Sequence, residues 1–324
     1  MRIPNSQRNF PSIIGEVVLI AFSILFALFI NNLNDQRKFR KVVDRDFIRV
    51  AKELEMNISD SKLAIKAFQR RDSIIYLALI DSIDYSDYQT NFNLISVLCG
   101  SIYPILDDQS CQNLISANNS ENDYKSDLLL DVQKVSTVKL FVEDEKVRMK
   151  DFVSDISYPY CSKIFANYVG VSGYNKEQQI NDLYHSVTSK EYRTLIYRYA
   201  HLNFLYMRTY LGFYKLAIET HNKICSEYNL ENTINSEVKN HIEEICGCYT
   251  NINRDTINFI CKNNSIFLAK RDTIPLLYIS DNLFITDKGT MSDQFISFYK
   301  KNNEQCVSIH LKSNKNIFTK ITEP

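Results

Sequence analysis

The chain has 324 residues, carries 38 Lys and Arg side chains against 38 Asp and Glu, and contains seven glycines, six prolines and no tryptophan. Equal charges exclude the strongly basic class of nucleic-acid-binding protein, and we expect no nucleic acid among its partners. The scarcity of glycine and proline favours long helices over a turn-rich fold in most of the chain.

An apolar run, Ile13–Asn34, follows a short N-terminal tail of residues 1–12. As a helix, the part up to Ile30 would extend roughly 27 Å at about 1.5 Å per residue, close to the ~30 Å hydrocarbon core of a bilayer. A signal peptide needs a small-residue cleavage site after its apolar core, and none follows Ile30. A buried core helix is a poor match, because nearly every helix face from Val17 onward is apolar. The pattern therefore predicts an uncleaved single-pass anchor in the lipid bilayer.

Four polar residues lie towards the ends of this anchor and are its candidate functional positions: Glu16, Asn31, Asn32 and Asn34. A carboxylate in hydrocarbon is costly unless it is neutralised or partnered. Glu16 therefore either contacts another copy of the anchor or another membrane protein, or lies near the interface at a helix N-terminus, where negative charge is favoured. The asparagines have the same two interpretations, hydrogen bonding between helices or capping at the interface.

The anchor resembles the membrane segment of one bacterial single-pass family. The residues that carry the resemblance are Gly15–Ile20 (GEVVLI) and Ala27–Lys38 (ALFINNLNDQRK). They are similar to the corresponding run in domain-of-unknown-function family 6090, with Ser23 in place of a usual glycine and Leu33 in place of a usual tryptophan. The resemblance fades towards residue 230. It implies a single-pass protein of the bacterial inner membrane with a short cytoplasmic tail, and it implies no activity.

Residues 35–230 are predicted to form an antiparallel bundle of long helices standing on the anchor. Apolar residues at helical spacing continue from Phe39 to Ile58, so the anchor helix should run on into the domain. The other predictions for this part are a second, more buried helix at Ile74–Ile83, a short helix at Leu94–Leu106, a polar surface loop at Asp107–Asp123 around Cys111–Ile115, a long helix at Ser126–Ile156 broken by Pro159, and a very regular helix at Glu191–Tyr228.

The helix Glu191–Tyr228 carries an apolar heptad seam, made of Leu195, Tyr199, Leu202, Tyr206, Thr209, Phe213 and Leu216. Spacings that alternate between four and three are typical of coiled coils. The seam fits either packing within the chain or an interface in a homo-oligomer, and packing within the chain is favoured.

Residues 231–247 are predicted to be a linking helix, mainly Asn232–Ile245, and the apolar period drops to two from Cys246. About seven short strands are expected in residues 248–324, at Asp255–Cys261, Ser265–Lys270, Leu276–Ser280, Leu283–Thr286, Phe295–Lys300, Gln305–Leu311 and Ile317–Ile321. Turns rich in Asn, Asp and Gly separate them. The pattern predicts a mainly α protein with a small C-terminal antiparallel β barrel or meander, which folds separately from the helices.

The C-terminal strands also resemble a known accessory domain. Gly247-Cys248-Tyr249, Ser265–Leu268, Ile279–Phe284 and Phe295–Phe298 are similar to the pattern of domain-of-unknown-function family 3471, a lipocalin-like domain that follows some bacterial serine hydrolases. The resemblance implies a lipocalin-like barrel and does not extend to a hydrolase domain.

The sequence contains no glycine-rich nucleotide loop, no Gly-x-Ser-x-Gly turn and no His-Glu-x-x-His pair. The eight cysteines lack Cys-x-x-Cys spacing, and the closest pair, Cys246 and Cys248, is interpreted as two small residues at a domain junction. His221 and His241 could approach Cys225 or Cys246, but single exposed helix histidines are the favoured interpretation. We expect no enzymatic activity, no cofactor and no metal site.

The sequence favours a membrane-anchored structural or interaction protein, whose partner is another copy of the chain or another membrane protein. The alternative is a small-ligand sensor or carrier that uses the C-terminal β domain. Basic residues follow the span at Arg37, Lys38, Arg40, Lys41 and Arg45, whereas only Arg2 and Arg8 precede it, so the positive-inside rule would keep the large domain in the cytoplasm. The family resemblance implies the periplasm, which is the favoured hypothesis.

Overall fold

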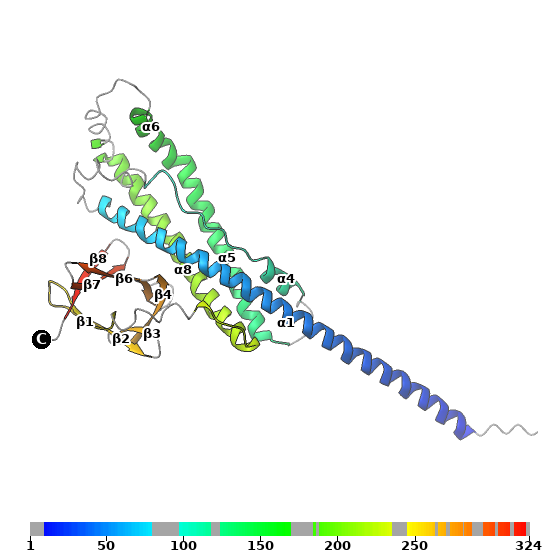
Figure 1. The fold of residues 1–324 in the computed structure, drawn as a ribbon. Helices are drawn as coiled ribbons and strands as arrows, with labels where there is room; N and C mark the ends of the chain where they lie inside the picture. The colour runs from blue at the N-terminus through cyan, green and yellow to red at the C-terminus, as the bar shows by residue number, and fades with distance from the viewer. Residues whose placement is uncertain are drawn as a thin grey trace, which may run out of the picture.

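The computed structural model describes residues 10–79, 97–117, 124–169, 184–185, 188–234, 245–262, 265–269, 273–280, 282–286, 294–301, 304–311 and 314–321. These residues form long helices followed by a C-terminal antiparallel β barrel (Figure 1). The predicted combination of a mainly helical chain, a long apolar N-terminal helix and a C-terminal antiparallel barrel is confirmed.

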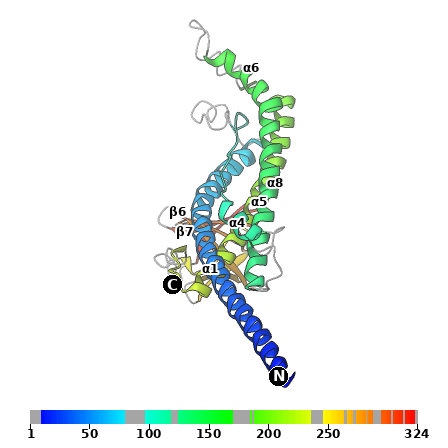
Figure 2. The same ribbon diagram turned by 90° about the vertical axis from the view of Figure 1, so that its right-hand side faces the viewer.

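Helix α1 (Phe10–Leu79) is a single helix of 70 residues, which at about 1.5 Å per residue extends roughly 105 Å. Its N-terminal part projects out of the body of the molecule, as both ribbon views show (Figures 1 and 2). Large apolar side chains are exposed all round this part, for example Leu19 at 70% and Leu25 at 65%. Exposed apolar surface of this extent marks a site of contact with a membrane or with another protein. The segment is therefore a candidate membrane span, consistent with a single-pass membrane protein.

The C-terminal part of α1 enters the core. Val43, Phe47, Val50, Leu54 and Ile58 are all buried, so the predicted continuation of the anchor helix is confirmed. The prediction that Ile74 begins a separate helix is wrong, because α1 runs without a break to Leu79. No glycine or proline interrupts the chain between Ile58 and Leu79, and Ile65, Phe68 and Ile75 extend the buried stripe at helical spacing.

The segment after the gap in the described residues corrects two further predictions. Residues 97–108 are turn and extended chain rather than the predicted helix ending near Leu106; Gly100 and Pro104 both disfavour a helix there. The predicted surface loop around Cys111–Ile115 is instead helix α4 (Gln109–Ala117), with Cys111 and Leu114 buried. Helix α4 begins where it does because its N-terminal amides bond to carboxylates, as described below.

Helix α5 (Ser126–Phe152), the π-helical turn η1 (Val153–Ser157) and α6 (Tyr158–Val169) follow one another directly. The predicted break at Pro159 is wrong, because Pro159 lies inside α6. A proline ring clashes with the carbonyl four residues before it in an α-helix. The wider π-helical turn before Pro159 relieves this conflict, since the carbonyls are displaced from their α-helical positions.

Helix α8 (Lys190–Tyr228) matches the predicted helix to within one residue. The Ser189 hydroxyl accepts a hydrogen bond from the Tyr192 amide at its start, and Asn229 ends it in a left-handed conformation with φ 51°. Along the heptad seam, Leu195, Tyr199, Tyr206 and Phe213 are buried.

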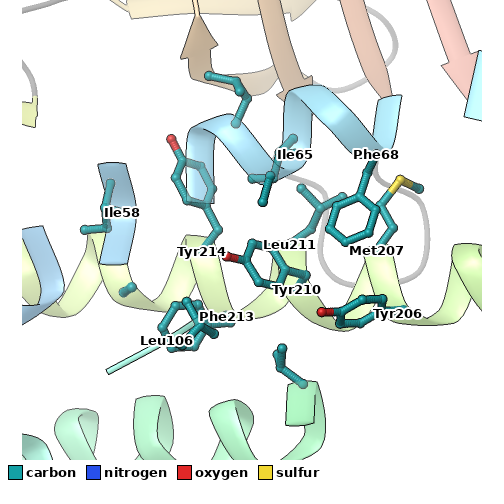
Figure 3. Packing of buried hydrophobic residues seen from close by; sticks show 14 of the residues in the cluster. Ile58, Ile65, Phe68, Leu106, Tyr206, Met207, Tyr210, Leu211, Phe213 and Tyr214 are labelled. Carbon is teal, nitrogen blue, oxygen red and sulfur yellow. The ribbon is translucent and has the colours of Figure 1, made fainter. Parts of the chain in front are cut away.

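Helix α8 lies antiparallel to α1. Phe47 packs against Tyr228 with ring centroids 6.0 Å apart, and Ser61 donates a hydrogen bond of 3.3 Å to Tyr210 further along both helices. Tyr206, Tyr210 and Leu211 of α8 lie against Ile65 and Phe68 of α1 in the centre of this contact (Figure 3). Helix α5 packs on α8 as well, where Lys223 forms an ion pair of 2.5 Å with Asp131.

The described strands are β1 (Gly247–Thr250), β2 (Thr256–Lys262), β3 (Ser265–Ala269), β4 (Thr273–Ser280), β5 (Leu283–Thr286), β6 (Phe295–Lys301), β7 (Glu304–Leu311) and β8 (Asn314–Lys320). Each pairs antiparallel with the next, and β1 pairs with β8 to close the barrel. The seven predicted strands are all present. The sequence missed β1, which closes the barrel. The predicted linking helix, Asn232–Ile245, lies mostly outside the described residues; α8 ends at Tyr228 and β1 begins at Gly247.

The barrel packs on the helices through one side of its outer surface. Ile279, Leu283, Ile285 and Phe295 belong to the same apolar cluster as the buried faces of α1 and α8. All four residues of β5 are buried, because one set of side chains faces the barrel interior and the other faces the helices. The helical and β parts therefore meet in an apolar contact, while the barrel interior forms a separate apolar cluster.

Candidate functional site

The four polar positions predicted for the anchor all lie on the projecting part of α1. Glu16, Asn31, Asn32 and Asn34 are exposed, and the Asn31 side-chain amide donates a hydrogen bond of 3.2 Å to Asp35 one turn later. The fold thus leaves all four accessible to lipid or to a second molecule.

A different set of residues forms a polar cluster inside the helical part, which sequence reasoning missed. Arg71 of α1 donates through Nη1 to the Gly100 carbonyl oxygen and to the Tyr199 hydroxyl. Tyr199, from α8, in turn donates a hydrogen bond of 2.9 Å to the same carbonyl oxygen. These bonds hold the extended segment (residues 97–108) between α1 and α8. The two helices are more than a hundred residues apart in the sequence.

Two cysteine thiols extend this cluster towards η1. Cys99 hydrogen-bonds Cys161 of α6, and this bond lowers the pKa of Cys161 because the Cys99 S–H stabilises a neighbouring thiolate. The same bond raises the pKa of Cys99, although the nearby Arg71 guanidinium opposes that increase. Ser157, the last residue of η1, donates to the Leu98 carbonyl oxygen and also hydrogen-bonds Cys161. The arrangement brings together Cys161, whose pKa is lowered, the Cys99 thiol and the Arg71 guanidinium.

One signal for this cluster is present in the sequence. Ser157 and Cys161 are four residues apart and so share a helix face, if the helix continues past Pro159. A helix that ended before Pro159 would not have this face, so the predicted break conceals the signal. The approach of Cys99 depends on the path of the extended segment, which no local pattern specifies.

His221 and Cys225 bring an imidazole and a thiol together, and the prediction of an exposed histidine is wrong for His221. His221 is 2% exposed, and the Cys225 sulfur lies 3.5 Å from its Nε2 atom. Burial lowers the pKa of His221 and raises the pKa of Cys225. Both shifts favour the neutral forms, so the pair is suited to packing rather than to nucleophilic chemistry. His241 lies outside the described residues.

Cys246 forms a disulfide with Cys261, with Cα atoms 6.0 Å apart. The interpretation of Cys246 and Cys248 as two small junction residues is therefore wrong for Cys246. The register explains the pairing: Gly247 lies opposite Phe259, which brings the residue before β1 alongside the end of β2.

A carboxylate and an amide on α1 hold the start of α4. Glu53, only 3% exposed, accepts hydrogen bonds from the amides of Ser110 and Cys111 at 2.6 and 3.2 Å. Asn57, one turn later, donates to the Asp107 carbonyl oxygen at 2.6 Å and accepts from the Asp107 amide at 3.0 Å. Negative charge at a helix N-terminus is favourable, so this contact explains both the burial of Glu53 and the start of α4.

The barrel interior is filled by aromatic and aliphatic side chains. Phe298 lies at its centre, with ring centroids 5.0 Å from Phe259, 5.6 Å from Phe284 and 6.1 Å from Tyr249. Tyr249 is fully buried, and its hydroxyl donates a hydrogen bond of 2.8 Å to the Ile245 carbonyl oxygen. Edge-to-face packing at these distances is the arrangement found in well-packed cores.

Comparison with known proteins returned no matching family model, no matching curated protein and no matching solved structure. Among the residues that the structure describes, no three His, Cys, Asp or Glu side chains gather as a metal site would require.

Proposed function

We propose that this chain is a membrane-anchored structural or interaction protein, in which a helical bundle stands on the bilayer and carries a β barrel. The observation that carries the proposal is the continuity of α1, which passes as one helix from the exposed apolar segment into the core. A continuous helix transmits position and orientation without a hinge. The barrel, packed on α1 and α8, would be held at a fixed place relative to the membrane.

The filled barrel interior supports an interaction role over the alternative of a small-ligand sensor or carrier. A barrel that binds a ligand needs an interior wider than its own side chains fill. Here Phe259, Phe284 and Phe298 occupy the centre. The outer surface away from the helices is then the part of the barrel that a partner would contact. We propose no enzymatic activity for this protein.

We propose further that the protein lies in the bacterial inner membrane with its large domain in the periplasm. The Cys246–Cys261 disulfide supports this side, because such bonds persist in oxidising compartments and are rare in the cytoplasm. The closed antiparallel barrel also supports the proposed likeness to the lipocalin-like family 3471. The likeness of the anchor to family 6090 remains part of the proposal.

Native mass spectrometry and in-membrane cross-linking test the interaction role. A photo-reactive residue at Ile252, which is 98% exposed at the β1–β2 turn, should yield a cross-linked product of higher mass in native membranes. The matched control is the same residue at the exposed Lys66 of α1, outside the barrel. A stoichiometric small molecule retained by the purified full-length protein, together with no cross-link at Ile252, would favour the sensor instead.

A further inference from the structure

The end of the helical bundle nearest the candidate span carries an ordered polar cluster. The start of α5 and the end of α8 lie beside α1 there, at the end from which the span projects (Figure 1). Asp44 of α1 accepts hydrogen bonds through Oδ1 from the Tyr124 hydroxyl at 2.9 Å and from the Tyr228 hydroxyl at 2.7 Å. One carboxylate therefore holds two tyrosine side chains, one just before α5 and one at the end of α8.

Tyr124 in turn positions a cation of α1. The Arg40 guanidinium carbon lies 5.2 Å from the centroid of the Tyr124 ring, a distance at which the ring face attracts a positive charge. By contrast, the Lys125 ammonium nitrogen lies 4.1 Å from the centroid of the Tyr228 ring and also forms an ion pair of 2.6 Å with Glu227. The charge of Lys125 is thus paired, whereas that of Arg40 is held by a ring alone.

Arg40 belongs to a basic collar, which consists of the exposed side chains Arg37, Arg40 and Lys41 just after the span. Residues three and four apart lie on the same face of a helix, so the three side chains share one side of α1. Within the part of the chain that the structure describes, none of the three forms an ion pair, in contrast to Lys38, which pairs with Asp35. The collar therefore presents three positive charges that no carboxylate neutralises.

The basic collar lies within reach of the lipid headgroups. At about 1.5 Å per residue, Arg37 lies roughly 10 Å and Arg40 roughly 15 Å beyond Ile30 along the helix. The headgroup layer adds roughly 5–8 Å to each side of the hydrocarbon core. Side chains of an α-helix tilt towards its N-terminus, which for α1 is the side of the span. The long arginine and lysine side chains therefore point back towards the lipid phosphates.

A groove along the span leads to the collar. It follows one face of α1 from Phe22 to Arg37. Phe22, Phe26 and Ile30 line its apolar part, while Asn34 and Arg37 lie at its polar end. The groove thus joins an apolar surface to a cation, which is the arrangement that an acyl chain with an attached phosphate requires.

We propose that the basic collar binds the phosphate group of an anionic phospholipid, whose acyl chain lies in the groove along α1. Arg40, held on the Tyr124 ring, donates to the phosphate oxygens together with Arg37 and Lys41. A neutral phospholipid binds less well, because its headgroup carries a positive charge that the collar repels. The proposal rests on the membrane-anchored role, since the collar meets lipid only if the span crosses the bilayer. It applies on either side of the membrane.

The test uses the absence of tryptophan from the chain. Leu33→Trp places a single indole at a residue that lines the groove. The full-length variant is reconstituted into phosphatidylcholine vesicles that contain a minor fraction of phosphatidylglycerol, and bromine on the acyl chains of one lipid or the other quenches the indole on contact. We expect brominated phosphatidylglycerol to quench roughly 3- to 10-fold more per lipid molecule than brominated phosphatidylcholine, and this excess should decrease at high salt.

Two sets of substitutions in the Leu33→Trp background remove three exposed cations each from α1. The collar variant carries Arg37→Gln, Arg40→Gln and Lys41→Gln, and the matched control carries Lys52→Gln, Lys66→Gln and Arg70→Gln. The phosphatidylglycerol excess should disappear in the collar variant and persist in the control. Tyr124→Leu keeps every charge but removes the ring that holds Arg40, and it should lower the excess roughly 2- to 5-fold. Circular dichroism verifies that each variant is folded.

Quenching by brominated phosphatidylcholine shows separately whether the span lies in the bilayer. Its absence would contradict the membrane-anchored role, and the lipid site with it. Equal quenching per molecule by the two lipids would leave that role intact and overturn the lipid site, as would an excess that the control loses as fully as the collar variant. An excess that is unchanged in Tyr124→Leu would show that net charge alone attracts the lipid, and would overturn the site built on Arg40.

Discussion

The Lys215 ammonium nitrogen lies 3.1 Å from the carbonyl oxygen of Thr286, and this contact joins α8 to β5 of the barrel. Lys215 is buried. It belongs to α8, the helix that also packs against α1 and α5. Nearby, the Tyr214 hydroxyl donates a hydrogen bond of 2.9 Å to the Tyr278 carbonyl oxygen of β4. Two successive residues of one helix thus bond the backbone of two neighbouring strands, which fixes the barrel by its main chain.

Replacing Lys215 with Met should destabilise the protein by about 1–3 kcal/mol, because the Thr286 carbonyl loses a donor in a buried contact. The measurement is the free energy of unfolding in urea for the domain without the anchor, followed by circular dichroism. The matched control is Lys66→Met on the exposed face of α1, which should change the free energy by less than about 0.5 kcal/mol. Equal effects of the two variants would show that the Lys215 contact contributes nothing to stability.

Removing the Glu53 carboxylate should loosen α4. Glu53→Ala leaves the Ser110 and Cys111 amides without their acceptor, and we expect a loss of about 1–3 kcal/mol. Hydrogen exchange at these two amides should accelerate more than exchange in α8. Lys52→Ala, an exposed change one residue earlier on α1, provides the control. Unchanged protection of α4 in Glu53→Ala would contradict the assigned role.

Burial raises the pKa of Asp72 to about 7, which predicts a pH dependence of stability. The Asp72 carboxyl is harder to ionise in the folded state than in the unfolded chain. The folded state is therefore more stable at low pH, where this carboxyl is protonated. This contribution decreases as pH rises from about 4 towards 7, by roughly 4 kcal/mol at 1.36 kcal/mol per pKa unit. Wild-type Tm should therefore decrease between pH 5 and pH 8 more than the Tm of Asp72→Asn. Asp151→Asn, an exposed change on α5, should leave the wild-type profile in place; equal profiles for wild type and Asp72→Asn would contradict this prediction.

The elements that depend mainly on neighbouring residues in the sequence were predictable from it. Strands β2 and β3 show the period-two alternation of side chains that face in and out of a barrel. Helix α8 carries an apolar stripe between a serine cap and an asparagine. The apolar N-terminal run was equally clear, because its length and composition are themselves the signal.

The rest depended on contacts between distant parts of the chain. The sequence around Cys111 is polar enough to suggest a loop, and α4 forms because Glu53 and Asn57 of α1 supply its capping partners. The polar cluster of Arg71, Cys99, Cys161 and Tyr199 draws on three helices and an extended segment. Neither spacing nor composition relates such residues to one another, so the candidate site was not predictable from the sequence alone.

Deleting residues 1–34 should release a soluble, folded protein. The exposed apolar side chains of the candidate span are removed, while the buried stripe of α1 from Val43 onward is retained. The measurement compares the full-length and truncated proteins after ultracentrifugation of lysed cells, with circular dichroism of the soluble fraction. Full-length protein in the supernatant without detergent would contradict a membrane anchor.

Accessibility of a single introduced cysteine should decide the side of the membrane. Ile252 is 98% exposed at the β1–β2 turn, so Ile252→Cys offers a thiol that requires no unfolding to react. We expect a membrane-impermeant maleimide to label this variant in intact spheroplasts more strongly than wild type, whose half-buried Cys99 and Cys248 set the background. Labelling that increases only after lysis would place the domain in the cytoplasm, as the basic residues after the span indicate. Periplasmic labelling would agree with the Cys246–Cys261 disulfide, and the basic cluster at Arg37–Arg45 would then be an exception to the positive-inside rule.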